Sequence, residues 1–372
     1  MGAALPSGHV NRVADAAEEP PATRILFVSH TDPYGPFRIG SHHLADALAR
    51  DGHDVVHLST PISAVHLITR RVSRAKAAAT PVDSVGEAGV RYLVPRTLLP
   101  AGIGAFRVTR RLRRLGLRGF DMVLIDQPLL WSRSLLRVAP AVVYRPTDEY
   151  PSGMKARLQR DAIRRVDGVI ATSRPVLDRL GPLPFPSTVI ENGVDTERFH
   201  TVDWRPRPEI CVYIGAFDSR FDWNQTMAWA GRFPRWRFVL AGPAATPPAA
   251  LPVNVELLGP VPYESVPRLL AEARIGLLPL SDDPLNRGRS PMKLYEYLAS
   301  GLSVVSRQTE VVHPDPARGV FTYTDAANAA EALQDAIRHA SPNAAGVEHA
   351  LGQAWTTKAR RLLEFVAGVT AR

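Results

Sequence analysis

The stretch "RILFVSH" (24–30) determines the fold class, together with the helical pattern over 41–51 and the strand-like "HDVVHLS" (53–59) that follow it. "RILFVSH" is apolar at consecutive positions rather than at alternate ones, which is typical of a parallel-sheet strand covered by helices on both faces. Ser41 is predicted to cap the helix, and Gly52 is predicted to end it. These segments therefore predict a strand–helix–strand unit.

The same alternation recurs along the chain in two series. The first continues with "VRYLVP", "DMVLID", "AVVYR" and "GVIATS", and the second contains "EICVYIG", "RFVLAG", "VELLG", "IGLLPL", "LSVVS" and "GVFTY". Between them lies the proline-rich polar segment "TVDWRPRPE" (201–209). The pattern predicts an α/β chain of two Rossmann-like domains, each a doubly wound parallel sheet, which face each other across a cleft.

We predict the domain boundaries from the same pattern. The N-terminal domain covers 24–204 and the C-terminal domain 205–372, while 1–23 is rich in Ala and Pro and is expected to be a disordered tail. The segment 343–371 predicts one or two helices and no further strand, and we expect the last helix to pack back toward the N-terminal domain.

Composition excludes several classes of protein. The single cysteine, Cys211, rules out a disulfide framework and a zinc site built on several thiolates, and it suits a reducing cytosol. No apolar run approaches the length of a spanning helix, and the tail does not resemble a signal peptide. We therefore expect a soluble or peripheral protein.

The positive charge is concentrated in one part of the chain. The net charge is +9, and residues 70–118 hold 12 basic and 2 acidic residues. Within "GAFRVTRRLRRLGLRG" (104–119), one predicted helical face is apolar, and the other faces carry Arg107, Arg110, Arg111, Arg114 and Arg118. A basic amphipathic helix favours an anionic membrane surface. A solvated face stays an alternative, and nucleic acid is disfavoured because aromatic residues for base stacking are nearly absent.

Polar residues follow the predicted strands where ligands bind in such sheets, at the carboxyl ends. The loop after the first strand carries His30, Asp32 and Arg38, which are expected either to contact a substrate or to form a hydrogen-bonded turn. Asp148, in "PTDEY" (146–150), is a candidate general base, with a turn-stabilising role as the alternative. No dinucleotide fingerprint or Walker loop is present.

A candidate anion site begins the segment "GRSPMKLYEYLASGLSVVS" (288–306). Ser290 is predicted as the N-cap, and Lys293 lies in the first helical turn, where a cation is disfavoured by about 0.3–1 kcal/mol unless an anion binds there. Glu296 is on the same face and could accept a hydroxyl of a sugar or ribose; a plain surface Lys–Glu pair is the alternative. Gly215, at a strand end, would let backbone N–H groups approach a phosphate, or would simply form a bend.

Several of these motifs together resemble a known family. "ENGVD" (191–195), "YIGAF" (213–217) and "SPMKLYEYLASGLSVVS" (290–306) occur in that order in glycosyltransferases of the GT-B architecture, and the resemblance covers about 24–370. It implies a nucleotide-sugar donor, with UDP as the expected nucleotide, on the C-terminal domain and an acceptor on the N-terminal domain. It also implies no metal and no cofactor, and the sequence contains no D-x-D motif.

Within that family the chain most resembles the xanthan-type glucuronosyltransferases. This resemblance implies an inverting transfer of glucuronate onto a lipid-linked glycan, by a cytoplasmic protein that is peripheral on the inner face of the plasma membrane. "YRPTD" (144–148) matches the stretch that carries the proposed base, which assigns that role to Asp148. Donor contacts are assigned in the same way to Ser290, Met292, Lys293, Ala216 and Phe217.

One residue departs from that pattern. Glu296 occupies the position where the xanthan-type enzyme has glutamine, and it would repel a glucuronate carboxylate and favour a neutral sugar. Retaining relatives carry a pair of glutamates spaced by seven residues, but the first would fall on Gly288, so the pair is missing. The donor sugar therefore stays open, and transfer of a neutral hexose to a soluble small-molecule or glycan acceptor is an alternative. Two rival functions also stay open, a nucleotide-sugar epimerase and a non-catalytic nucleotide-sugar-binding protein.

Overall fold

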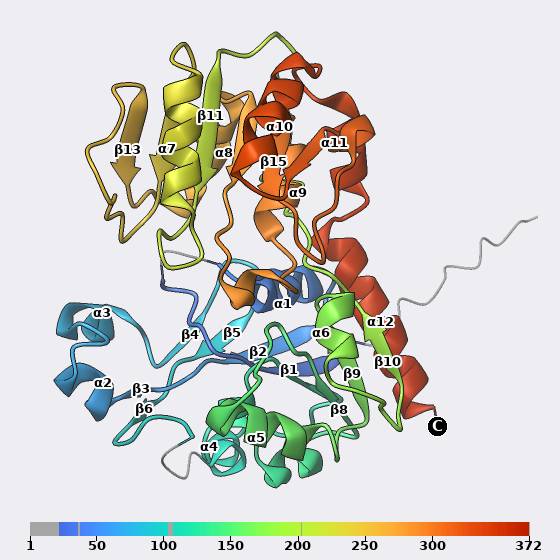
Figure 1. Cartoon of the computed structure of the whole chain (residues 1–372). Helices are drawn as coiled ribbons and strands as arrows, with labels where there is room; N and C mark the ends of the chain where they lie inside the picture. Colours follow the sequence, from blue (N-terminus) through green and yellow to red (C-terminus); the bar gives the residue numbers. More distant parts are fainter. Residues whose placement is uncertain (1–21, 36–37, 103–106, 202, 372) are drawn as a thin grey trace, which may run out of the picture.

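The computed structural model describes residues 22–35, 38–102, 107–201 and 203–371, and Figure 1 shows two sheets, each flanked by helices. Most of the predicted tail, 1–23, lies outside the described residues. The predicted α/β class with parallel sheets in two domains is confirmed.

The first sheet has eight strands in the order β10-β9-β8-β7-β1-β2-β5-β4, and every pairing is parallel except that of β4 with β5. Its strands are β1 (Arg24–Val28), β2 (Asp54–Leu58), β4 (Asp83–Val85), β5 (Arg91–Leu93), β7 (Met122–Ile125), β8 (Ala141–Tyr144), β9 (Gly168–Ala171) and β10 (Ser187–Val189). A separate parallel pair consists of β3 (Ile62–Ser63) and β6 (Arg96–Thr97).

The second sheet has six parallel strands in the order β13-β12-β11-β14-β15-β16. They are β11 (Ile210–Ile214), β12 (Arg237–Ala241), β13 (Val255–Gly259), β14 (Ile275–Leu278), β15 (Ser303–Arg307) and β16 (Val320–Tyr323). In both sheets the first strands in sequence are central, and ligands of such sheets bind at the carboxyl ends of these strands.

The helices fall into the same two groups. Those before the second sheet are α1 (Gly40–Arg50), α2 (Ala64–Ile68), α3 (Arg74–Ala79), α4 (Val108–Arg114), α5 (Gly153–Ala162) and α6 (Arg174–Asp178). The others are α7 (Trp223–Arg232), α8 (Val266–Ala271), α9 (Met292–Ala299), α10 (Ala326–Arg338), α11 (Ala344–Leu351) and α12 (Trp355–Thr370). Short 3-10 turns are η1 (Pro128–Leu130), η2 (Arg133–Arg137), η3 (Tyr263–Ser265), η4 (Pro284–Asn286) and η5 (Pro316–Arg318).

The central strands of each sheet are buried on both faces, which is why they are largely apolar, whereas the edge strands β4 and β13 are partly exposed. In β1, Leu26 belongs to one hydrophobic cluster and Phe27 to another on the opposite face. In β11, Val212 likewise belongs to one cluster and Cys211 to the cluster on the opposite face, where the Cys211 thiol is fully buried. The period-2 alternation of side chains across the strand distributes them to the two cores.

The last helix, α12, covers a face of the first sheet although it follows the second sheet in sequence (Figure 1). Trp355, Leu362 and Val366 are buried in one cluster with side chains of β1. The chain thus crosses between the domains twice, once before β11 and once before α12.

The predicted cap of the first helix is wrong. Ile39 occupies the N-cap position of α1, and Ser41 lies inside the helix with its side chain buried. Its hydroxyl is 2.9 Å from the Ser29 hydroxyl and 3.1 Å from Nε2 of the buried His57. A buried imidazole requires a hydrogen-bond partner, and Ser41 supplies it instead of capping the helix.

Candidate functional site

The start of α9 is exposed to the space between the domains. Pro291, not Ser290 as predicted, occupies the N-cap position, and no side chain caps the first N–H groups of the helix. The Ser290 hydroxyl accepts a hydrogen bond from the backbone N–H of Asn192 at 3.2 Å, and the Asn192 amide donates to the Ser290 carbonyl at 2.8 Å. Ser290 therefore joins the two domains and leaves the helix N-terminus free for an anion.

Lys293 lies in the first turn of α9, with its ammonium against the end of β11. Nζ is 4.8 Å from the ring centroid of Tyr213 and 3.5 Å from its hydroxyl. A Cβ added to Gly215 would lie 2.1 Å from Nζ, so a glycine is required where the ammonium approaches the backbone. Within the described residues no carboxylate lies within 4.0 Å of this cation, and burial lowers the pKa of Lys293 to about 8.

Glu296 is one turn further along α9, and its side chain and that of Lys293 line one cavity. Burial raises the pKa of its carboxyl to about 7, although the nearby Lys293 ammonium acts in the opposite direction. No hydrogen bond to this carboxylate occurs in the part of the chain that the structure describes, so its oxygens are available to a ligand.

The cavity lies between the carboxyl ends of β11 and β12, the start of α9 and one side chain from the first domain. Its lining includes Gly215, Gly242, Met292, Tyr263 and Arg38. Arg38, which was expected to contact an acceptor, instead reaches this cavity and is paired with Asp46. The cavity therefore has two cations, Lys293 and Arg38, and one carboxylate, Glu296, at one end of the second sheet.

Sequence reasoning missed Gly242, which follows β12. Its φ angle is +152°, and a Cβ there would lie 1.7 Å from the carbonyl oxygen of Gly215. Two adjacent strand ends approach each other at glycines, which keeps side chains out of the cavity floor. The only signal in the sequence is that "RFVLAG" (237–242) ends in glycine.

The two residues after Gly215 do not line the cavity. Phe217 is buried in a hydrophobic cluster, with its ring stacked on Trp223 at 5.0 Å. The carbonyl of Ala216 accepts the Tyr213 hydroxyl at 2.8 Å. The ring of Phe217 thus belongs to an aromatic cluster of the core, and the contact of Ala216 and Phe217 with a nucleotide stays a prediction.

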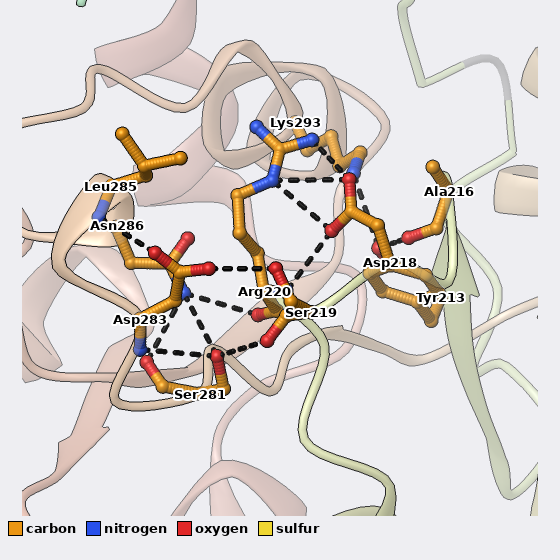
Figure 2. Close-up of polar contacts among 10 residues, drawn as sticks. All are labelled: Tyr213, Ala216, Asp218, Ser219, Arg220, Ser281, Asp283, Leu285, Asn286 and Lys293. Carbon is orange, nitrogen blue, oxygen red and sulfur yellow. Dashed lines mark hydrogen bonds and ion pairs between the residues drawn. The ribbon is translucent and has the colours of Figure 1, made fainter.

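A second cation lies beside Lys293 and was also missed. Figure 2 shows Arg220, whose Nε is 3.1 Å from each carboxylate oxygen of Asp218. The Arg220 carbonyl accepts from Ser281 N–H at 2.9 Å and from the Asn286 amide at 3.1 Å, which fixes the loop. The hydrogen bonds that Arg220 donates to Asp218 raise the pKa of Arg220, and the positive charge of Arg220 contributes to lowering the pKa of Lys293.

Asp148 belongs to the first domain. It follows β8, and its carboxylate accepts a hydrogen bond from the Thr147 hydroxyl at 3.3 Å. It does not line the cavity at the start of α9 but a separate small cavity with Gly288 and Arg289, and its negative charge contributes to raising the pKa of Arg220. His30 is on the same side: burial lowers the pKa of its imidazole while Asp148 raises it, and its Nδ1 is buried without a hydrogen bond among the described residues.

Asp32 takes part in a hydrogen-bonded turn, which was the alternative to contact with a substrate. Its carboxylate accepts the backbone N–H of Tyr34 at 3.0 Å and pairs with Lys76 at 3.5 Å. These contacts form a turn and tie it to α3. Arg38 thus lines the cavity at the start of α9 and Asp32 takes part in a hydrogen-bonded turn, while the contact of His30, Asp32 and Arg38 with an acceptor stays a prediction.

The predicted basic amphipathic helix has no free apolar face. It is confined to α4, whose Val108 and Leu112 are buried in the core of the first domain. Arg107, Arg110 and Arg114 are exposed, whereas Arg111 is half-buried. Residues 103–106 lie outside the described residues. The expectation of an apolar helical face directed to a membrane is therefore wrong, because the core uses it, and only the charges are available.

Two kinds of feature are absent from the described residues. None of their helices is long and apolar enough to cross a membrane. Nowhere among the same residues do three or more His, Cys, Asp or Glu side chains gather in a way that would hold a metal ion.

The chain is similar to known glycosyltransferases in both halves. Residues 39–198 match the family Glycosyltransferase Family 4, and residues 224–364 match Glycosyl transferase-like. A putative teichuronic acid biosynthesis glycosyltransferase, TuaH of Bacillus subtilis, is 31% identical over 131 residues, which is 31% of this chain and 33% of the relative. The match thus spans about a third of the length of that curated relative.

Solved structures show the same fold at low sequence identity. The sucrose-phosphate synthase of Thermosynechococcus elongatus has a TM-score of 0.68 at 16% identity, with 94% of this chain and 99% of that chain covered. Anabaena Alr3699/HepE, solved in complex with UDP, has a TM-score of 0.66 at 15% identity, with 93% and 100% covered. Both halves of the chain thus resemble glycosyltransferases, and the chain shares the fold of glycosyltransferases with the GT-B architecture.

Proposed function

We propose that the protein transfers a sugar from a nucleotide diphosphate donor, with UDP as the nucleotide, to an acceptor hydroxyl. The observation that carries this proposal is Lys293, a cation in the first turn of α9 with a lowered pKa and no carboxylate partner within 4.0 Å in the described chain. A diphosphate would supply the missing negative charge, and its oxygens would accept hydrogen bonds from the free N–H groups at the start of the helix. Anabaena HepE, which shares the fold, was solved with UDP and with UDP and glucose.

In this proposal the positive groups stabilise the leaving group. Lys293, Arg220 and the N-terminus of α9 would hold the diphosphate as the bond between its oxygen and the anomeric carbon of the donor sugar breaks, and UDP leaves. Asp148 would accept the proton of the acceptor hydroxyl that attacks the anomeric carbon, which gives an inverting transfer. No metal or cofactor takes part, since fixed cations provide the charge.

Two arguments favour different donor sugars. The resemblance to xanthan-type enzymes supports glucuronate. A neutral hexose is the second candidate, and the free Glu296 carboxylate in the cavity favours it because two carboxylates in one partly buried site repel each other. A panel that contains both kinds of donor separates these candidates.

The acceptor in this proposal is a lipid-linked glycan on the inner face of the plasma membrane. Exposed Arg107, Arg110 and Arg114 supply charge for an anionic surface. Apolar contact would come from Ile68 and Leu98, which are 80% and 82% exposed and follow the paired strands β3 and β6. The protein would then be cytoplasmic and peripheral.

Calorimetry with UDP tests the proposal, followed by thermal-shift screening against nucleotide diphosphate sugars. We expect UDP to bind and one UDP-sugar to stabilise the protein more than UDP alone. Absence of binding by every nucleotide diphosphate would refute the proposed donor. Product analysis with and without an added acceptor then distinguishes transfer from epimerisation.

A further inference from the structure

Arg179, at the C-terminal end of α6 in the first domain, contacts carboxylates from both halves of the chain. Its Nη1 is 3.0 Å from Oε1 of Glu149, and its Nη2 is 2.7 Å from each carboxylate oxygen of Glu310. Glu149 directly follows Asp148, and Glu310 lies beyond β15 in the second domain. One guanidinium therefore connects the segment of the proposed base to the opposite domain.

The loop before α9 is held at the same place. The Ser173 hydroxyl donates to the Gly288 carbonyl at 2.5 Å, and the backbone N–H of Glu310 donates to the Arg287 carbonyl at 3.1 Å. A Cβ added to Gly288 would lie 2.6 Å from Oε1 of Glu149. The Glu149 carboxylate thus occupies the space that a side chain at 288 would need, which gives a physical reason for a glycine there.

We propose that Arg179 is a positioning residue that fixes the Asp148–Glu149 segment against the loop leading into α9. Because α9 carries Lys293, this contact sets the position of the base relative to a donor bound on α9. The proposal rests on the proposed function. The Arg179 and Glu310 side chains are 37% and 42% exposed, and ion pairs of such exposure add little to stability, so their effect is on geometry. A guanidinium suits this role because its planar fork binds carboxylates directionally.

The first test replaces Arg179 with Gln and measures steady-state transfer. Misplacement by about 1 Å costs on the order of a hundredfold in rate, so we expect kcat to fall about ten- to a hundredfold while UDP affinity and thermal stability stay unchanged. Glu310→Gln should lower kcat as well, and the double variant should add little to the larger single effect. Arg174→Gln is the matched control, since Arg174 is 76% exposed and, among the described residues, pairs only with Asp178 on the same helix.

The second test uses the close contact at Gly288. Gly288→Ala should displace the flexible Glu149 carboxylate and lower kcat, whereas the same change in a Glu149→Ala background should cost nothing further. Additive effects of the two changes would overturn the proposal, as would an Arg179→Gln variant that keeps wild-type kcat. Equal losses in UDP affinity and stability would indicate a structural role only and would also overturn it. Failure of the wild-type protein to bind UDP refutes the proposed function instead.

Discussion

Replacement of Lys293 by Met should abolish tight UDP binding and at the same time stabilise the ligand-free protein. Met keeps most of the side-chain volume and removes the charge. A pKa lowered from 10.5 to about 8 corresponds to about 3 kcal/mol of unfavourable free energy for the charged form in the fold. That cost is present below pH 8 and disappears above the unfolded pKa, so the gain in stability from Lys293→Met should be greatest at neutral pH and vanish near pH 10.5.

The same substitution should weaken the binding of UDP, although it stabilises the ligand-free protein. A charge-assisted hydrogen bond contributes about 1.5–3 kcal/mol, so UDP affinity should fall about ten- to a hundredfold or more. Calorimetry measures the affinity, and chemical denaturation at pH 7 and pH 10 measures the free energy of unfolding. Unchanged UDP affinity would exclude Lys293 from the site, and a less stable variant at pH 7 would refute the argument that the buried ammonium is strained.

Three further substitutions test the remaining parts of the site. Asp148→Asn should lower kcat by about 10²- to 10⁴-fold with donor affinity unchanged, and wild-type turnover would refute its role as base. Gly215→Ala places a Cβ 2.1 Å from Nζ of Lys293, so the ammonium must move and UDP affinity should fall about tenfold by calorimetry. Charge reversal at Arg110 and Arg114 should weaken binding to anionic vesicles by about 1 kcal/mol or more for each lost cation, so less protein should sediment with them. Undiminished sedimentation would contradict the membrane proposal.

The chain offers matched controls for two of these variants. Gly231→Ala adds a Cβ with no atom within 4 Å and should not affect UDP binding, although it should stabilise α7 by roughly 0.5–1 kcal/mol. Arg268 is 87% exposed and lies in the second domain, so its charge reversal should leave vesicle binding unchanged.

The outline of the fold was predictable because it depends on local patterns. Strands buried on both faces must be apolar at every position, and the alternation of such strands with helices permits few topologies. The basic first turn of α9 and the glycine at the end of β11 were also visible, since a cation at a helix N-terminus contradicts the helix dipole and therefore suggests a bound anion.

The roles of individual polar groups were less predictable. The hydroxyls of Ser41 and Ser290 have the sequence context of helix caps, yet the first satisfies a buried histidine and the second bonds to Asn192 in the other domain. Local propensity describes what a hydroxyl can do within its own turn. Which partner it takes depends on the buried groups that need a hydrogen bond, and those come from distant parts of the chain.

The sequence by itself determined most of the strands and helices and the basic first turn of α9, because each depends on residues within a few positions of one another. Only the tertiary structure decided that Arg220 lies beside Lys293 and that Arg179 links the two domains through Glu310, 131 positions away. These arrangements consist of single contacts between residues remote in sequence. Local sequence patterns do not predict such contacts, because they depend on how the two sheets and their connecting loops pack together.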